Sequence, residues 1–297
     1  MKEIKRLAVL GGDRRQIFMT RELSRQGYSV RVWGLGLCQG EVGNAYVCNT
    51  WEEAIEGTEA VVLPLPISSD GVRINTPLHS DEASLRIDTL MDQMEGRLLL
   101  GGRISETVQG LARREGVQYV DYYESELLQQ KNALPTAEGA IFVAMQTLPI
   151  TIDGATVAVL GYGRIGSLLA AKLAALGADV TVLARRQEAL TAAELCHHRT
   201  IRIRQEPNGA AIPSLPKDCR MIFNTVPQRL IPNHALSIIP KDCLYVDLAS
   251  APGGIDHTAA ATVGVRSVWA TALPGKYAPE TAGVILGEVI DAVLQDA

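Results

Sequence analysis

The sequence has 297 residues, 47% hydrophobic and 21% charged, which suffices for two domains with separate cores and excludes a disordered chain. Its net charge of −5, without a stripe of Lys and Arg, excludes nucleic acid as the expected partner. No apolar run approaches the roughly 20 residues of a membrane span, so we expect a cytoplasmic protein that does not bind membranes.

The cysteines indicate neither a metal site nor a disulfide framework. There are five, with no C-x-x-C pair and no histidine at zinc-ligand spacing. We expect reduced thiols that act as small hydrophobic residues, and no bound metal. They are Cys38, Cys48, Cys196, Cys219 and Cys243.

A strand–helix–strand pattern occurs twice along the chain. The first copy has an apolar run at 7–10, a helical segment at 14–26 closed by Gly27, and a strand at 29–33. The second has a strand at 157–160, a helix at 164–176 closed by Gly177, and a strand at 179–184. Gly11 and Gly161 differ by 150 positions, as do Gly27 and Gly177, so the pattern predicts two βαβ domains in tandem.

Further apolar runs support the repeat, since 60–63 matches 221–223 and 98–102 matches 244–250. Strands that alternate with helices predict parallel sheets, whose ligands bind outside the carboxyl ends of the strands. We therefore expect an α/β fold of two Rossmann-like, doubly wound parallel-sheet domains with a cleft between them.

The predicted boundary lies near Pro135, where Asn132, Ala133, Leu134 and Pro135 read as a loop before a helix that starts at Thr136. Residues 1–134 then form a substrate domain and residues 135–280 a cofactor domain. The segment 281–294 has the spacing of an amphipathic helix, and we expect residues 281–297 to pack back on the first domain.

The cofactor site is predicted from the segment VAVLGYGRIG, which places Gly161, Gly163 and Gly166 between a strand and a helix. Gly161 allows the tight turn, Gly163 lets a pyrophosphate approach the backbone, and Gly166 allows close helix packing. The free N–H groups of the helix N-terminus then face the phosphates.

The end of the next strand favours NADP over NAD. An NAD site carries Asp or Glu there for the ribose hydroxyls, whereas this strand reads DVTVLARR. Ala184 stands at the acidic position, and the guanidinium groups of Arg185 and Arg186 suit a 2′-phosphate. The alternative is an exposed arginine pair without a role.

The first copy lacks this pattern, since Gly12 is followed by Asp13, Arg14, Arg15 and Gln16, which places a side chain where a pyrophosphate would need bare backbone. We expect no dinucleotide there. The helix N-terminus and the two arginines suit a small carboxylate substrate instead. An alternative with equal weight is that Arg14 and Arg15 are solvated charges on the helix face and bind no substrate.

The two-domain plan resembles the D-2-hydroxyacid dehydrogenase and adenosylhomocysteinase group. The reactive residues of those dehydrogenases do not carry over, because YVDLASAPGGID lacks their Arg. Neither His234 nor His257 sits in a recognisable acid–base arrangement, and a lone histidine is more often structural.

Five stretches in order resemble the A subunits of dipicolinate synthase, namely LAVLGGDRRQ, NALPTAEGAI, NTVP, YVDLASAPGGID and LPGKYAPETAGVIL. The resemblance implies action with a flavoprotein-like B subunit in sporulation, on a branch from the lysine pathway. The implied reaction is NADP-dependent dehydration and oxidation of 4-hydroxy-tetrahydrodipicolinate to dipicolinate (pyridine-2,6-dicarboxylate). We expect a homo-oligomer or hetero-oligomer.

These arguments together predict three sets of site residues. The cofactor-binding residues are Gly161, Tyr162, Gly163, Arg164, Ile165, Gly166, Ala184, Arg185, Arg186, Thr225, Val226, Pro227, Ala249 and Ser250. The substrate residues are Arg14, Arg15, Gly101, Gly102 and Thr136. The candidate acids and bases are Asp13, Glu138 and Lys276, with Tyr277 as a further candidate.

Two other functions stay open at this point. One is an NADP-dependent 2-hydroxy- or 2-keto-acid oxidoreductase. The other is a regulatory module that binds NADP and catalyses nothing, which the lack of a clear acid–base pair allows.

Overall fold

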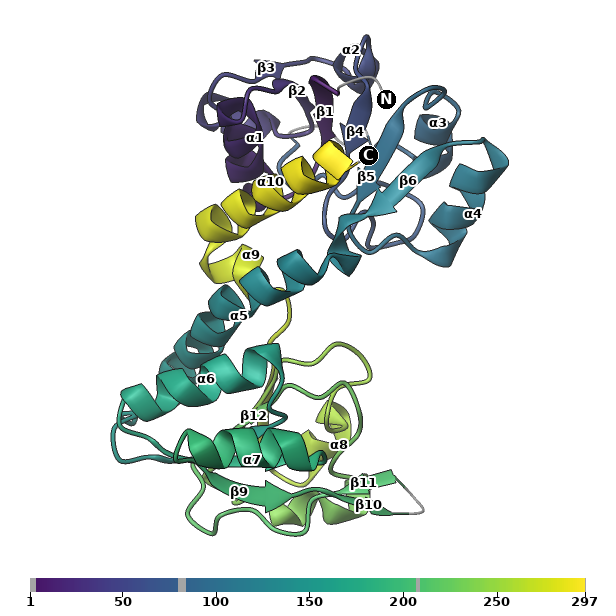
Figure 1. The fold of residues 1–297 in the computed structure, drawn as a ribbon. Coiled ribbons are helices and arrows are strands. Elements are labelled where there is room, and N and C mark those ends of the chain that lie inside the picture. Colours follow the sequence, from purple (N-terminus) through teal and green to yellow (C-terminus); the bar gives the residue numbers. More distant parts are fainter. Residues whose placement is uncertain (1–3, 80–83, 207–208, 297) are drawn as a thin grey trace. The chain divides into compact units, whose positions relative to one another are not determined.

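The computed structural model describes residues 4–79, 84–206 and 209–296. The chain divides into two compact units (Figure 1). Unit 1 comprises Met1–Asn132 and Ala278–Ala297, and unit 2 comprises Ala133–Tyr277. The sequence predicted the domain boundaries between residues 134 and 135 and between residues 280 and 281, whereas the units meet between residues 132 and 133 and between residues 277 and 278.

Unit 1 is built on a six-stranded sheet in which every strand pair is parallel. The strand order is β3-β2-β1-β4-β5-β6, so the chain winds outward from β1 in both directions. The strands are β1 (Arg6–Leu10), β2 (Ser29–Trp33), β3 (Tyr46–Val47), β4 (Ala60–Val62), β5 (Leu98–Gly101) and β6 (Gln118–Asp121).

Unit 2 repeats this topology, with the parallel order β14-β13-β12-β7-β8-β9. Its strands are β7 (Thr156–Leu160), β8 (Asp179–Ala184), β9 (Arg199–Arg202), β12 (Met221–Asn224), β13 (Leu244–Asp247) and β14 (Arg266–Trp269). A separate antiparallel pair, β10 (Arg204–Glu206) and β11 (Gly209–Ala211), follows β9. The predicted fold class of two doubly wound parallel α/β domains is confirmed, while the predicted cleft stays a prediction.

Helices flank both sheets. They are α1 (Arg14–Arg25), α2 (Trp51–Ile55), α3 (Ile87–Met91), α4 (Glu106–Arg114), α5 (Glu126–Thr147), α6 (Arg164–Ala175), α7 (Gln187–Leu195), α8 (His257–Thr262), α9 (Leu273–Tyr277) and α10 (Pro279–Asp296). Short 3-10 segments lie at η1 (Gly36–Glu41), η2 (Tyr122–Glu124) and η3 (Asn233–Ile238). Within the described residues, none of the helices has both the length and the apolar character needed to cross a membrane.

The central strands are buried on both faces. In β7, Val157 and Val159 belong to one apolar cluster, whereas Ala158 and Leu160 belong to another on the opposite face. Alternate residues of a strand point to opposite faces, so a strand covered by helices on both sides must be apolar throughout. This explains why the sequence shows short continuous apolar runs instead of an alternating pattern.

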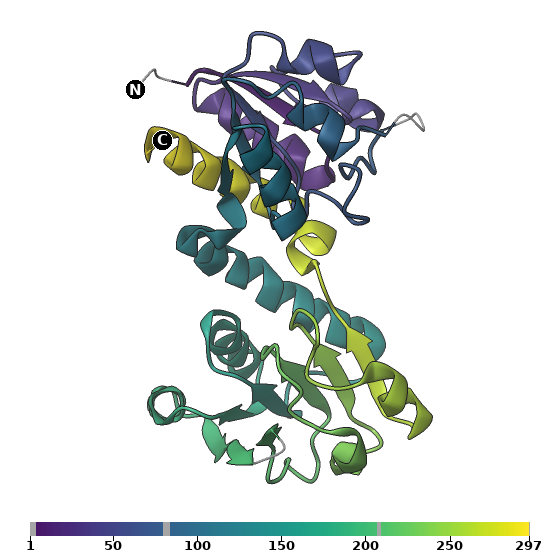
Figure 2. The same cartoon turned by 90° about the vertical axis from the view of Figure 1, so that its right-hand side faces the viewer.

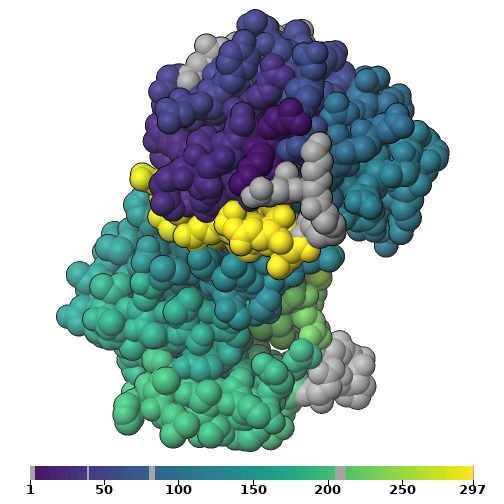
Figure 3. Space-filling view, turned by 45° about the horizontal axis from the view of Figure 1, so that its top comes forward, coloured from purple at the N-terminus to yellow at the C-terminus, as the bar shows by residue number. Residues whose placement is uncertain are grey.

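The C-terminal helix α10 belongs to unit 1, where it packs along α1 (Figure 3). Gly283 and Gly287 make the close approach possible, because a Cβ atom at Gly283 would collide with the backbone of Arg15 and one at Gly287 with the side chain of Glu22. Leu286 and Ile290 of α10 lie fully buried in the core of unit 1. The first domain is therefore completed by the end of the chain.

The predicted loop at residues 132–135 was wrong. These residues lie inside α5, which runs from Glu126 to Thr147 without a break (Figure 2). Pro135 removes one backbone hydrogen bond, a local cost of about 3 kcal/mol in a helix interior. Burial of Leu128, Ala133 and Ala137 offsets this cost, so the proline stands within the helix and does not end it.

Candidate functional site

The N-terminus of α6 presents bare backbone. Gly163 is its N-cap, and this residue has no side chain with which to cap the helix. A Cβ atom at Gly163 would meet nothing within 4 Å, whereas one at Gly166 would collide with the carbonyl group of Gly161. Close packing therefore explains Gly166, while the open space at Gly163 leaves the approach to the helix dipole free for an anion.

The corresponding turn before α1 is closed by its own side chains. The Asp13 carboxylate accepts from Arg15 N at 3.0 Å, and Gln16 Oε1 accepts from Asp13 N at 2.8 Å. A Cβ atom at Gly12 would collide with the Gln16 side chain. The capping box thus satisfies the helix N-terminus internally, which agrees with the expectation that only unit 2 takes a dinucleotide.

The loop after β12 lies directly against the glycine turn. Thr225 donates its hydroxyl hydrogen to Leu160 O at 2.9 Å. A Cβ atom at Gly161 would meet the side chains of Thr225 and Val226. The structure therefore brings together four predicted cofactor residues, Gly161, Gly166, Thr225 and Val226, at the carboxyl ends of β7 and β12.

The end of β8, where the sequence motif predicts the ribose, is strongly basic. β8 ends at the buried Ala184, and the exposed Arg185 and Arg186 follow it. An open pocket of about 600 Å³ lies there, lined by Arg185, Arg186, Arg202, Ile203 and Arg204. Arg185 and Arg186 were predicted from the sequence, whereas Arg202 and Arg204 were not.

Tyr162, which stands between Gly161 and Gly163, packs near the end of β8. It packs against Ala184, Ala189 and Leu190, and its ring meets the His198 ring edge-on at 6.2 Å between centroids. Burial, with a hydrogen bond to Cys196, raises the pKa of the Tyr162 hydroxyl to about 12. Tyr162 is therefore a neutral group near neutral pH and contributes packing, not charge.

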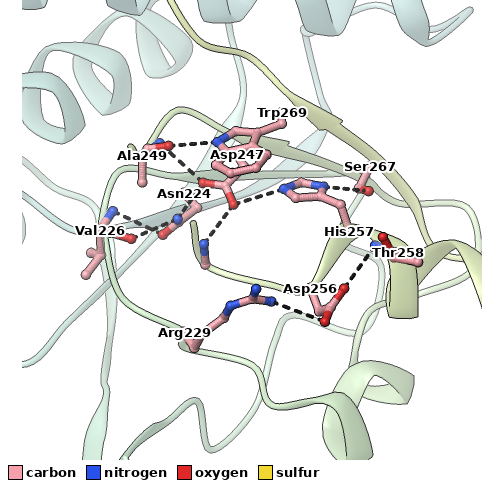
Figure 4. Close-up of polar contacts among 11 residues, drawn as sticks. Asn224, Val226, Arg229, Asp247, Ala249, Asp256, His257, Thr258, Ser267 and Trp269 are labelled. Atoms are coloured by element: carbon pink, nitrogen blue, oxygen red, sulfur yellow. Dashed lines mark hydrogen bonds and ion pairs between the residues drawn. The ribbon is translucent and has the colours of Figure 1, made fainter. Parts of the chain in front are cut away.

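A buried carboxylate anchors the loops at the carboxyl ends of β12 and β13 (Figure 4). Asp247 is fully buried, and its Oδ1 accepts from Asn224 Nδ2 at 2.8 Å and from Ala249 N at 3.2 Å. Its Oδ2 accepts from Gly254 N at 2.7 Å. Asn224 in turn pairs twice with the backbone of Val226. Asp247 therefore holds together the two loops predicted to border the nicotinamide.

His257 completes this network: it pairs with Asp247, a partner that the sequence did not reveal, and its contacts fit the structural role expected for it. Its Nε2 lies 3.3 Å from Asp247 Oδ2 and its Nδ1 lies 3.0 Å from Ser267 Oγ. A carboxylate only accepts, so Nε2 carries the proton that it donates to Asp247. The ring also stacks on Trp269, whose indole donates to Ala249 O at 2.8 Å. Because both ring nitrogens already have partners within the protein, we assign His257 a structural role, which is to hold the Asp247 carboxylate in position.

The comparisons with known proteins address the whole chain. The family model for the N-terminal domain of the dipicolinate synthase A subunit matches residues 6–123, and that of ketopantoate reductase PanE/ApbA matches residues 157–228. The dipicolinate synthase A subunit of Bacillus subtilis (strain 168) is 31% identical over 294 residues, which covers 98% of this chain and 96% of that protein. This chain belongs to the family of dipicolinate synthase A subunits. The predicted resemblance is confirmed.

Solved structures from the same family agree with this assignment. The dipicolinate synthase A subunit from Bacillus halodurans has a TM-score of 0.86 at 28% identity, covering 98% of this chain and 97% of that one. Its counterpart from Bacillus subtilis has a TM-score of 0.84 at 30% identity, and the match covers 100% of this chain and 97% of that one. A transhydrogenase from Sinorhizobium meliloti shares the fold, with a TM-score of 0.70 at 14% identity, covering 97% and 93%.

In this member of the dipicolinate synthase family, the predicted substrate residues of unit 1 already have structural partners. Arg15 is buried, forms an ion pair with Asp13 at 2.8 Å and donates to Leu65 O at 2.5 Å. Arg14 is exposed and pairs with Glu41 at 3.1 Å. Gly101 and Gly102 are buried under apolar side chains.

The remaining predicted residues lie in unit 2. Glu138 on α5 pairs with Lys172 at 2.8 Å, and Tyr277 packs against the Phe142 ring at 4.8 Å between centroids. Thr136 lies on the same helix as Glu138, and Lys276 is exposed on α9. No described contact joins Glu138 to Lys276, so the structure does not assemble them into an acid–base pair.

The cysteines offer no metal site. All five are free, and Cys48, Cys219 and Cys243 are buried. Over residues 4–79, 84–206 and 209–296, no cluster of three or more His, Cys, Asp or Glu side chains is arranged to hold a metal ion.

Proposed function

We propose that the chain binds NADP(H) in unit 2 and, with a flavoprotein-like B subunit, converts 4-hydroxy-tetrahydrodipicolinate to dipicolinate in sporulation. The reaction balances as loss of one water and transfer of one hydride to NADP⁺, which gives dipicolinate, NADPH and a proton. Membership of the dipicolinate synthase family supports the substrate and the partner.

One observation supports the nucleotide site above all others, namely the uncapped N-terminus of α6 beside the open space at Gly163. A pyrophosphate there would accept hydrogen bonds from backbone N–H groups of the first turn, which the N-cap residue Gly163 has no side chain to cap. The second unit differs from the first at this point, because Asp13 stands at the position of Gly163 and caps its own helix.

The carboxyl ends of β12 and β13 would face the nicotinamide. NADP⁺ supplies the hydride acceptor when it is bound. The loops there hold Thr225, Val226 and Pro227, and Ala249 and Ser250, whose small or apolar side chains would suit a flat ring. The Asp247 network fixes both loops before any ligand arrives, which reduces the entropy lost on binding.

The substrate and acid–base assignments remain part of the proposal. Arg14 is more accessible to a carboxylate than Arg15, whose guanidinium is buried against Asp13. The ion pairs of Asp13 and Glu138 favour a structural role for both carboxylates. Lys276 is the exposed candidate for proton transfer.

The nucleotide assignment predicts that NADP⁺ binds at least tenfold more tightly than NAD⁺. Charge-assisted hydrogen bonds from Arg185 and Arg186 to the 2′-phosphate are worth about 1.5 to 3 kcal/mol. Titration calorimetry with both cofactors measures the ratio. Equal affinities, or a preference for NAD⁺, would contradict the assignment of Ala184, Arg185 and Arg186.

A further inference from the structure

The arginines at the end of β8 are joined by two more from the neighbouring strand. Ala184 pairs with Arg202 in the β8–β9 ladder, and Ile203 N donates to Ala184 O at 2.9 Å. Ile203 is 3% exposed, whereas Arg202 and Arg204 on either side of it are exposed. Residues two apart in an extended chain share a face, so both guanidinium groups lie on the side of the pocket.

The pocket carries uncompensated positive charge. Among the side chains that the structure describes, none of the four guanidinium groups has a carboxylate partner; Arg202 donates only to the neutral Gln187 Oε1, at 3.5 Å. Four like charges around one pocket repel each other, and a bound dianion removes that repulsion. In a chain with a net charge of −5, such a cluster is not a consequence of overall composition.

Helix α7 adds a second source of positive potential. It begins at Gln187, and the side chain of its N-cap residue, Arg186, makes no capping hydrogen bond to the helix. The contact from Arg202 to Gln187 places this N-terminus beside the pocket. A phosphate monoester is the ligand that suits both features, since it is a dianion near pH 7 with three acceptor oxygens.

We infer that Arg202 and Arg204 bind the 2′-phosphate of NADP(H) together with Arg185 and Arg186, and that they set the preference for NADP over NAD. This inference rests on the proposed NADP site. Arg185 and Arg186 approach the phosphate from the end of β8, while Arg202 and Arg204 approach it from the adjacent strand.

The test is calorimetric titration of NADP⁺ and NAD⁺ into the wild-type protein, Arg202→Ala, Arg204→Ala and the double variant. Each single substitution is expected to weaken NADP⁺ binding about tenfold, the scale of one charge-assisted contact, and to leave NAD⁺ affinity within about twofold. Arg199→Ala is the matched control, because Arg199 lies on the same strand but is paired with Asp179 at 2.7 Å. It should bind both cofactors as the wild type does.

The outcomes separate this inference from the function on which it rests. If the wild type prefers NADP⁺ and the variants keep that preference, Arg202 and Arg204 are not in the site, although the proposed function stands. Equal losses for NADP⁺ and NAD⁺ would show that the two arginines support the fold or another phosphate, and would overturn the inference. A wild type without preference would contradict both.

Discussion

Replacing Gly163 by Val is expected to abolish dinucleotide binding and to leave the fold intact. The backbone at Gly163 is close to the extended region, with φ −94° and ψ −159°, so valine there does not need the left-handed conformation that favours glycine. The new side chain would enter space that holds no protein atom within 4 Å of the Cβ position. In the proposed site that space is the approach of the pyrophosphate, so we expect NADP⁺ affinity to fall about a hundredfold or more, the loss of roughly 3 kcal/mol.

Calorimetry and thermal melting of Gly163→Val together check this prediction. Gly110→Val is a matched control, since Gly110 lies in α4 of unit 1 and a Cβ atom there also meets nothing within 4 Å. The control should melt and bind like the wild type. A Gly163→Val protein that melts normally and binds NADP⁺ with unchanged affinity would place the cofactor elsewhere.

Replacing Asp247 by Ala is expected to weaken both the fold of unit 2 and cofactor binding. Three groups from separate segments, Asn224 Nδ2, Gly254 N and His257 Nε2, would lose their acceptor in a fully buried position. Removing one partner from such a network costs about 3 to 5 kcal/mol. With their common anchor gone, the two loops would no longer be held in place, and we expect NADP⁺ affinity to fall at least tenfold.

Urea unfolding gives the change in stability, and calorimetry at a temperature where the variant is folded gives the affinity. Asp247→Asn provides a milder variant, because one carbonyl oxygen remains as an acceptor. Asp256→Ala is the control, since Asp256 lies on the same loop region but makes no described contact with Asp247: it caps α8 and pairs with Arg229 at 3.9 Å. It should lose about 1 kcal/mol of stability and bind NADP⁺ normally. Wild-type affinity in folded Asp247→Ala would show that these loops do not border the nicotinamide.

Local sequence signals predicted much of the fold correctly. The glycine turn and the strand end at Ala184 follow from backbone requirements that few residues satisfy, and the structure has β7, α6 and β8 where the pattern placed them. Proline is a strong local signal too, but at Pro135 burial of the surrounding helix outweighed it. The rule that proline ends a helix considers one residue alone, so it does not include the free energy that the rest of the helix gains by packing.

The parts of the site that were missed depend on strand pairing. Arg202 lies beside Ala184 only because β9 pairs with β8, a register that the sequence does not display. The alternation of Arg202, Ile203 and Arg204 after an apolar strand was the available signal. Asp247 ends a wholly buried strand, and a buried carboxylate needs hydrogen-bond partners. The sequence therefore carried a signal for a polar network there, which was not used, but no signal for His257.

The most direct test of the central claim is to follow NADPH and dipicolinate together in one assay. The chain, with and without the flavoprotein-like B subunit, is given 4-hydroxy-tetrahydrodipicolinate and either NADP⁺ or NAD⁺. The account predicts equal amounts of NADPH and dipicolinate from the complete assembly, with a much slower reaction when NAD⁺ replaces NADP⁺. Dipicolinate formed without reduction of NADP⁺, or NADPH produced from simple 2-hydroxy acids by the isolated chain, would contradict it.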